Sequence, residues 1–255
     1  MNYPASQTVR RRALFQEMMA AHCIDRTVIV TGSFRAGTSF VCSLLGANGM
    51  AGIRAERFSK LVPLAARPED EALGSQLDQI FSTAANGLFV TKIMWPHRNA
   101  LARVLGFERD DSAALAKIFP RARWINVIRR DKLGQAVSYW KAKETDRWQQ
   151  MKAHEVSSEP DYDFERIRAC FVELAAHDML WQDFHARAGT DVRHIVYEDF
   201  VERVVTDLPS LLDWLDGHRL ETGPIKTASP LKQQRNGHSD EMRERFLADL
   251  YRTGF

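Results

Sequence analysis

A short apolar run, a glycine-bounded turn and a helical pattern follow one another near the start of the chain. Residues 27–31 read TVIVT, a β-branched run typical of a buried strand, and residues 32–37 then break it as a turn. Beyond the turn, apolar residues recur at helical spacing: Phe40, Val41, Leu44 and Leu45. In this layout the loop amides and the unpaired amides of the first helical turn converge on one spot, where the helix dipole favours an anion. The stretch therefore predicts a P-loop-like phosphate-binding loop after the first strand.

The rest of the hydrophobic pattern predicts alternating strands and helices. Three more runs of strand length occupy residues 88–91, 123–128 and 194–196. Helical spacing predicts helices over residues 6–22, 68–85, 132–147, 164–187, 209–215 and 240–251. Strands that alternate with helices are typical of a central parallel sheet flanked by helices. We therefore predict a single α/β domain over residues 1–255, with an N-terminal helix within residues 1–24 and a basic loop and helix within residues 222–255.

The turn matches the spacing of the loop that binds nucleoside triphosphates, with one informative departure. Residues 32–39 fit G-x-x-x-x-G-x-S, but Thr38 stands where that loop needs its lysine. A magnesium-binding aspartate is expected at another strand end, and the best candidate strand runs into Arg129 and Arg130 instead. The loop is therefore predicted to hold a phosphate-bearing ligand that reacts without magnesium. A strand-to-helix turn that binds nothing is the alternative.

Several charged residues are predicted to lie at the same edge of the sheet. Lys92 follows the second strand, and Arg129 follows the third, with Ser138 in the helix beyond. Ligands of open parallel sheets bind at the carboxyl ends of the strands, so these side chains are candidate anion contacts. Glu56 follows the helix that begins at the loop and can fold back over this edge, although most carboxylates are surface groups. Cations of a C-terminal loop either reach a phosphate or belong to a basic surface loop: Lys226, Lys232 and Arg235.

Other residue groups have simpler interpretations. The basic triplet at residues 10–12 is predicted to be the solvated face of the first helix. His177 and His185 lie eight positions apart without ligand-spaced partners, so they predict no metal site. Three aromatic residues have the chemistry to stack a nucleotide base but fit core packing better: Tyr139, Trp140 and Trp148.

Composition and charge narrow the classes of function. The chain has 255 residues, 45% hydrophobic and 27% charged, which is an ordinary globular composition. Its 35 basic and 33 acidic residues give a net charge of +2, so no nucleic-acid partner is predicted. Three scattered cysteines, Cys23, Cys42 and Cys170, fit a reducing compartment. No stretch has the length and apolarity of a signal peptide or membrane span, so we expect a cytoplasmic protein.

Taken in chain order, these motifs resemble the sulfotransferase superfamily. Within it they are most similar to the bacterial carbohydrate sulfotransferases, the trehalose-sulfating enzymes among them. The resemblance spans about residues 27–250. The residues that carry it are Ser33 to Ser39, Lys92 to Trp95, Arg129 to Trp140, Arg147-Trp148, Tyr197 to Asp199 and Ser239 to Glu241.

The resemblance implies a donor, 3′-phosphoadenosine 5′-phosphosulfate, and an acceptor hydroxyl on a carbohydrate or glycolipid. It assigns the 3′-phosphate to Arg129 and Ser138, and it places Arg235 in a C-terminal lid over the nucleotide. Glu56 matches the catalytic carboxylate of the family, in a Gly-x-x-x-Glu-x-Phe context. The segment between Glu56 and Lys92 is shorter than in the trehalose-sulfating members, which leaves the acceptor sugar open. The 5′-phosphosulfate is assigned to Ser33, Phe34, Arg35, Ala36, Gly37, Thr38 and Ser39.

The residues and the resemblance together predict sulfuryl transfer by in-line displacement without a metal. Glu56 is expected to take the proton of the acceptor hydroxyl, with His97 as the next candidate base. Arg35 and Lys92 are expected to stabilise the charge that grows on the leaving phosphate. A degenerate phosphate-loop kinase and a non-catalytic nucleotide-binding protein are the alternatives. A homodimer and peripheral contact with a lipid-linked acceptor both stay open.

Overall fold

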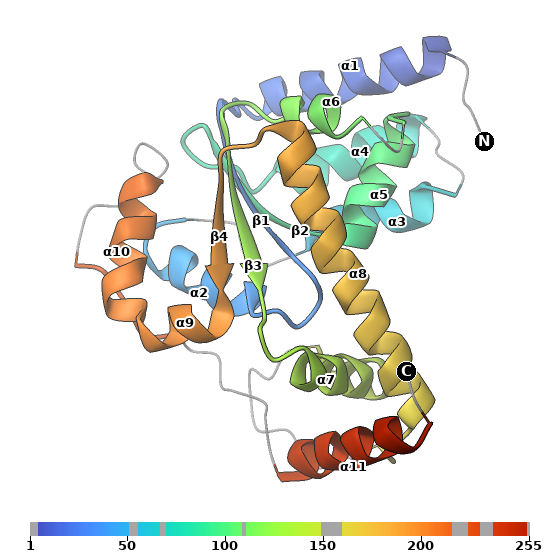
Figure 1. Cartoon of the computed structure of the whole chain (residues 1–255). Coiled ribbons are helices and arrows are strands. Elements are labelled where there is room, and N and C mark those ends of the chain that lie inside the picture. The colour runs from blue at the N-terminus through green and yellow to red at the C-terminus, as the bar shows by residue number, and fades with distance from the viewer. Residues whose placement is uncertain are drawn as a thin grey trace.

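A sheet of four parallel strands forms the centre of the computed structural model, in the order β2-β1-β3-β4 (Figure 1). The strands are β1 (Arg26–Gly32), β2 (Leu88–Met94), β3 (Ala122–Ile128) and β4 (Val192–Val196). Because they are parallel, their carboxyl ends meet at one edge of the sheet, where candidate ligand contacts are expected. The structure describes residues 5–50, 56–66, 70–108, 111–148, 160–215, 224–229 and 237–253.

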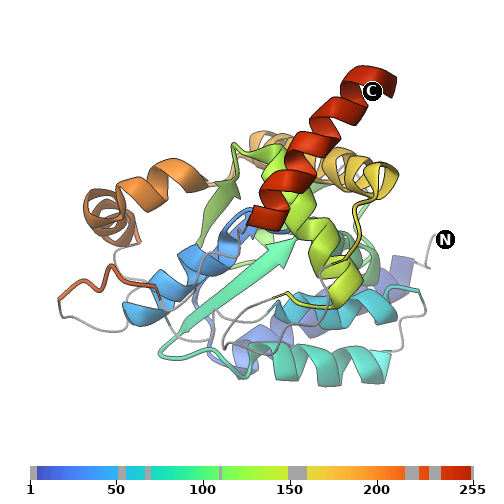
Figure 2. The same ribbon diagram turned by 90° about the horizontal axis from the view of Figure 1, so that it is seen from below.

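Helices cover both faces of this sheet. Their bounds are α1 (Ala5–Ala21), α2 (Thr38–Ala47), α3 (Leu61–Leu64), α4 (Asp70–Phe81), α5 (Trp95–Val104), α6 (Ser112–Lys117), α7 (Lys132–Thr145), α8 (Phe164–Ala188), α9 (Tyr197–Glu202), α10 (Val204–Trp214) and α11 (Gly237–Thr253), with a 3₁₀ helix η1 (Arg57–Lys60). Helices α2, α9 and α10 lie on one side of the sheet, and α8 lies on the other with α4 and α5 (Figure 1). Helices α7 and α11 lie beyond the carboxyl ends of the strands, where α11 crosses α7 (Figure 2).

The strands are buried on both faces, which explains why short apolar runs identified them. Val28 and Val30 of β1 pack in a hydrophobic cluster with α2 and α10. Ile29, between them, points to the opposite cluster with residues of α1, α4, α5 and α8. A third cluster joins α7, α8 and α11. Parallel strands covered by helices read as continuous apolar runs, as β1 does.

The predicted α/β fold with a parallel sheet is confirmed, and several boundaries change. Strand β2 continues to Met94, so Lys92 lies inside this strand and not after it. Helix α10 begins at Val204, before the Pro209 that was predicted to start it, and α11 begins at Gly237. The 3₁₀ helix η1 and helices α3, α5, α6 and α9 were not predicted, because short helices carry few apolar repeats.

Arg11 corrects the prediction that the basic triplet of α1 is solvated. Its side chain is fully buried, whereas the neighbouring Arg10 side chain is 78% exposed. The Nε of Arg11 donates to Oδ1 of Asp70 at 2.9 Å, and Nη1 donates to the carbonyl of Val104 at 3.5 Å. A buried guanidinium needs such partners, and α4 and α5 supply them only in the folded chain.

Candidate active site at the carboxyl edge of the sheet

The loop between β1 and α2 is a tight turn whose shape depends on Gly37. This residue has a φ of 100°, in the left-handed region that favours glycine. A Cβ at this position would lie 2.1 Å from Cδ2 of Tyr197, at the start of α9. Arg35, two residues earlier, has a φ of 62°. The glycine is therefore required by its backbone conformation and also by a ring from a distant part of the chain.

Buried side chains of α7 and α8 hold the loop in place. Gln135 is fully buried, and its Nε2 donates to Oγ of Ser33 at 2.8 Å and to the carbonyl of Phe34 at 2.7 Å. Nε1 of Trp181 donates to the carbonyl of Gly32 at 3.1 Å. These hydrogen bonds satisfy loop groups that would be costly to bury unpaired. Neither Gln135 nor Trp181 was predicted to contact the loop, because a helical repeat does not show which loop a buried polar group touches.

Two arginines lie together beside the loop. Arg35 donates from Nε to Oγ of Ser138 at 2.9 Å, and Arg129 donates from Nη1 to the carbonyl of Arg35 at 3.2 Å. Burial, reinforced by the charge of Arg129, lowers the pKa of Arg35 to about 10. Among the described residues, the buried Nε of Arg129 has no hydrogen-bond partner, and Oε1 of Glu198 lies 3.9 Å from it. The predicted residues Arg35, Arg129 and Ser138 are thus neighbours, and the two adjacent cations favour an anion between them.

Side chains of the segment from Tyr197 to Asp199 form hydrogen bonds with the residues that follow β3. Oε2 and Oε1 of Glu198 accept hydrogen bonds from the backbone amides of Arg130 and Asp131, at 3.0 and 3.1 Å. Burial alone would raise the pKa of Glu198, but these amides and the charge of Arg129 hold it below its usual value. Asp199 accepts from Nη2 of Arg130 at 2.7 Å. This motif therefore positions Arg129 by fixing the residues next to it.

Lys92 joins the loop side of the site to a carboxylate. Its side chain is buried, and Nζ donates to Oγ of Ser39, on the first turn of α2, at 3.2 Å. The same Nζ lies 2.9 Å from Oε1 of Glu56, which immediately precedes η1. This ion pair offsets the cost of burying an ammonium group, which explains how a lysine lies within β2. The structure therefore brings the predicted residues Glu56, Lys92 and Ser39 into one chain of contacts.

His97, on the first turn of α5, lies on the other side of the Glu56 carboxylate. Its Nε2 is 3.7 Å from Oε2 of Glu56, and its Nδ1 accepts from the backbone amide of Met94 at 3.4 Å. An acceptor at Nδ1 places the proton of the neutral imidazole on Nε2, which faces Glu56. Burial lowers the pKa of His97, although Glu56 opposes this shift, so the neutral form is favoured.

The predicted contacts from the C-terminal loop are only partly within the described residues. Arg235, Lys232 and Gly52 lie outside them. The backbone of Lys226 pairs with the side-chain amide of Asn48, at 2.8 and 2.9 Å, just beyond the C-terminal end of α2. A helix of this length spans about 15 Å, so the Lys226 backbone lies at the opposite end of α2 from the loop. The geometry does not support its predicted phosphate contact.

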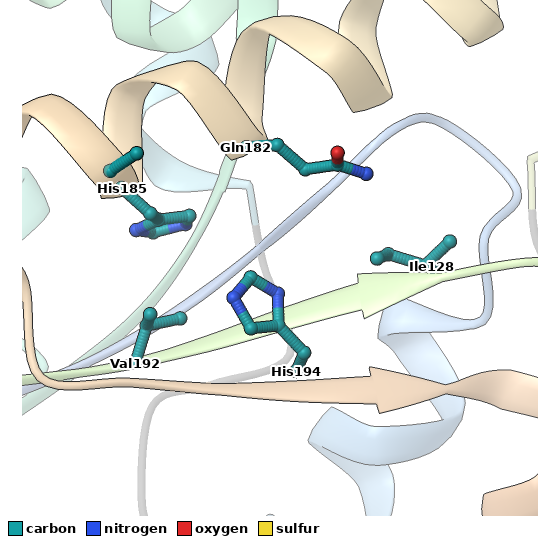
Figure 3. Close-up of a pocket in the computed structure, with 6 residues that line it drawn as sticks. Ile128, Gln182, His185, Val192 and His194 are labelled. Carbon is teal, nitrogen blue, oxygen red and sulfur yellow. The ribbon is translucent and has the colours of Figure 1, made fainter.

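A separate pocket of about 460 Å³ lies between α8 and strands β3 and β4 (Figure 3). It contains none of the predicted site residues. Burial and the charge of His194 lower the pKa of His185 to about 3, so this imidazole is neutral. Its Nδ1 forms a hydrogen bond with Oγ1 of Thr190 at 2.8 Å, and its Nε2 forms one with Oγ1 of Thr31 at 3.3 Å. The residues that line the pocket are Ile128, Gln182, His185, Ala186, Val192 and His194.

The described parts of the chain contain neither a grouped metal site nor a helix that could span a membrane. No three His, Cys, Asp or Glu side chains there are grouped as a metal site would need. No helix within those same ranges has the length and apolarity to cross a membrane.

The region that contains these residues matches a known family. The Stf0 sulphotransferase model matches residues 27–249, from the beginning of the first predicted strand into α11. Trehalose 2-sulfotransferase of Mycobacterium tuberculosis (strain ATCC 35801 / TMC 107 / Erdman) is 25% identical to the chain over an alignment 264 positions long. The alignment covers 90% of this chain and 97% of that protein. The resemblance seen in the motifs is thereby confirmed. The matched region contains the loop between β1 and α2, the neighbouring Arg35 and Arg129, and the Glu56–Lys92 contact, and this chain belongs to the Stf0 sulphotransferase family.

Proposed function

We propose that this protein transfers the sulfuryl group of 3′-phosphoadenosine 5′-phosphosulfate to a hydroxyl of a carbohydrate or glycolipid by in-line displacement. One observation carries the proposal: Nζ of Lys92 contacts both Ser39, next to the loop, and Glu56. This contact puts a proton acceptor beside the place where a phosphate loop would hold the reacting group. Such proximity is what acid–base catalysis of the transfer needs.

The residues around the loop fit a nucleotide with anionic groups at both ends. We assign the 5′-phosphosulfate to Arg35 and the loop amides, and the 3′-phosphate to Arg129 and Ser138. The buried Nε of Arg129, without a hydrogen-bond partner among the described residues, is a donor suited to a phosphate oxygen. Arg235 remains a proposed lid residue. The loop residues assigned to this contact are Ser33, Phe34, Arg35, Ala36, Gly37, Thr38 and Ser39.

The proposed roles follow from which atoms face one another. When bound, the donor supplies the sulfuryl group and leaves as adenosine 3′,5′-bisphosphate. Glu56 accepts the proton of the attacking hydroxyl, and Lys92 and Arg35 stabilise the negative charge on the leaving phosphate. Lys92 binds one Glu56 oxygen, and the Nε2–H of neutral His97 faces the other, so the carboxylate is held from both sides. In this proposal these cations take the place of a metal ion.

The test is transfer of radiolabelled sulfate from the phosphosulfate donor to a panel of acceptors, with and without EDTA. The panel contains trehalose, the sugar named for the mycobacterial relative, with other disaccharides, glycolipids and lipopolysaccharide fragments. We expect a labelled carbohydrate product whose formation EDTA does not change. Phosphate transfer from ATP that EDTA abolishes would instead identify a kinase. Binding of adenosine 3′,5′-bisphosphate without transfer to any acceptor would identify a non-catalytic binding protein.

A further inference from the structure

Three aromatic side chains, one from the loop and two from α7 and the residues just after it, pack against one another. The rings of Phe34 and Tyr139 stack with centroids 5.3 Å apart and an interplanar angle of 8°. The Trp148 ring completes the set, with centroids 5.8 Å from Phe34 and 6.0 Å from Tyr139. We call these three residues the aromatic shelf. Tyr139 is buried, Phe34 is half-buried, and Trp148 is 39% exposed, so the shelf is buried at one side and open at the other.

Trp148 is held at both its side chain and its backbone although it is exposed. Its Nε1 donates to Oδ1 of Asp146, at the C-terminal end of α7, at 2.9 Å. Its carbonyl accepts a hydrogen bond from Nη1 of Arg35. In the neighbouring Tyr139, the hydroxyl donates to Oε1 of Glu173 at 2.8 Å. A large apolar ring fixed in this way loses little conformational freedom when a ligand packs on it, which favours binding.

The shelf is continuous with the side of the site that contains Glu56. The Phe34 ring meets the His97 ring edge to face, with centroids 6.0 Å apart and an interplanar angle of 82°. Nε2 of the same His97 lies 3.7 Å from Oε2 of Glu56. An open aromatic surface therefore begins one side chain away from the proposed base.

We propose that the aromatic shelf binds a pyranose ring of the acceptor, with the ring packed on Trp148 and Phe34 and a hydroxyl turned toward Glu56. A pyranose has an apolar C–H face and a rim of hydroxyls. It therefore matches an exposed aromatic face that lies next to a hydrogen-bonding carboxylate. The shelf reaches Glu56 through His97, which favours a sugar over the adenine base. This inference rests on the proposed function and assigns the acceptor subsite of that same reaction.

The experiment compares Trp148→Ala with Trp148→Phe, using trehalose as the first probe and any better acceptor from the panel as the second. Both variants keep the carbonyl that Arg35 contacts, so the loop contact is unchanged by design. We expect Trp148→Ala to raise the acceptor KM about tenfold and to reduce saturation-transfer NMR signals from the sugar C–H protons. Loss of about half the burial of a large apolar side chain corresponds to this factor. Trp148→Phe should stay within about threefold of the unchanged protein, because it preserves an aromatic face.

Two controls make the outcome specific. Tyr251→Ala removes an aromatic side chain that is 93% exposed on α11. It should change neither the acceptor KM nor the affinity for the nucleotide. Calorimetry with adenosine 3′,5′-bisphosphate should give the same affinity for Trp148→Ala as for the unchanged protein. If Trp148→Ala kept an unchanged acceptor KM and normal transfer, the proposal that the aromatic shelf binds the acceptor sugar would be wrong. The proposed function would still stand. A tenfold loss of nucleotide affinity with an intact acceptor KM would show that the shelf stacks the base, and it would also overturn the proposal.

Discussion

The two sides of the loop between β1 and α2 both carry cations, half-buried on the side of β3 and buried on the side of β2, but they balance the charge differently. On the side of β3, Arg129 lies against Arg35, and its Nε is 3.9 Å from Glu198. On the side of β2, Nζ of Lys92 lies 2.9 Å from Oε1 of Glu56. A cation beside another cation attracts an anion, whereas a cation beside a carboxylate holds that carboxylate in place. This difference agrees with the roles proposed above, in which the β3 side binds the donor and the β2 side takes the proton.

The substitution with the largest expected effect on this comparison is Glu56→Gln. The amide keeps the size of the side chain but cannot take a proton, so turnover should fall on the order of a hundredfold or more. Affinity for adenosine 3′,5′-bisphosphate, measured by calorimetry, should stay the same because it depends on the β3 side. Glu165→Gln, on the surface of α8, serves as the matched control and should leave both quantities unchanged. Intact turnover in Glu56→Gln would remove Glu56 from its role and make His97 the next candidate base.

The complementary change on the β3 side is Arg129→Ala or Arg35→Ala. Each charged hydrogen bond contributes about 1.5–3 kcal/mol, so nucleotide affinity should fall about tenfold to a few hundredfold. Arg166→Ala is the matched control, because this arginine of α8 is 61% exposed and pairs with the surface residue Glu144, at 2.6 Å, and with Asp163. Equal losses of affinity for Arg129→Ala and Arg166→Ala, by calorimetry, would mean that the site responds to general charge and not to Arg35 and Arg129.

Gly37→Ala tests whether the loop between the two sides depends on its contact with Tyr197. The new Cβ would lie 2.1 Å from the tyrosine ring in a left-handed conformation, so the free energy of unfolding should fall by about 2 kcal/mol. Gly189→Ala has the same kind of backbone, with a φ of 58°, but nothing within 4 Å of the added atom. It should cost about 1 kcal/mol through strain alone. Equal losses in urea denaturation would show that the Tyr197 contact does not matter.

The smallest expected effect is on the free energy of unfolding. It comes from His185 in the pocket beside α8, away from both sides of the loop. The pKa of His185 is about 3 in the folded chain and near its ordinary value of 6.5 when unfolded. The unfolded chain therefore binds the proton first, and the stability that His185 contributes is present above pH 6.5 and is lost as the pH falls. Between pH 6.5 and 5.5 this loss is about 1 kcal/mol.

Urea denaturation at these two pH values, for the unchanged protein and for His185→Gln, measures that effect. The variant should lose less stability over the interval, because glutamine does not titrate. Nucleotide affinity at pH 6.5 should be the same in both proteins. If both proteins lost stability in parallel, the acid sensitivity would come from other groups.

Local pattern was enough to predict the four strands and the turn that follows the first of them, but not the residues that contact this turn. The β-branched run before Gly32 and the two glycines around Arg35 already specify a strand and a turn. Gln135 and Trp181, which hold that turn, belong to helices far along the chain. A helical repeat shows that a side chain is buried, but it does not show what it touches.

The amino-acid sequence by itself determined the parallel α/β fold, the turn between the first strand and its helix, and the position of Arg129 just after β3, because these depend on spacing within a few residues. Only the tertiary structure decided that Arg11 is buried while Arg10 is exposed, and that Glu56 lies between Lys92 and His97. The physical reason is that burial and ion pairing are set by groups brought together from separate elements. A carboxylate or guanidinium is stabilised or left solvated according to those neighbours, whatever its own position in the chain.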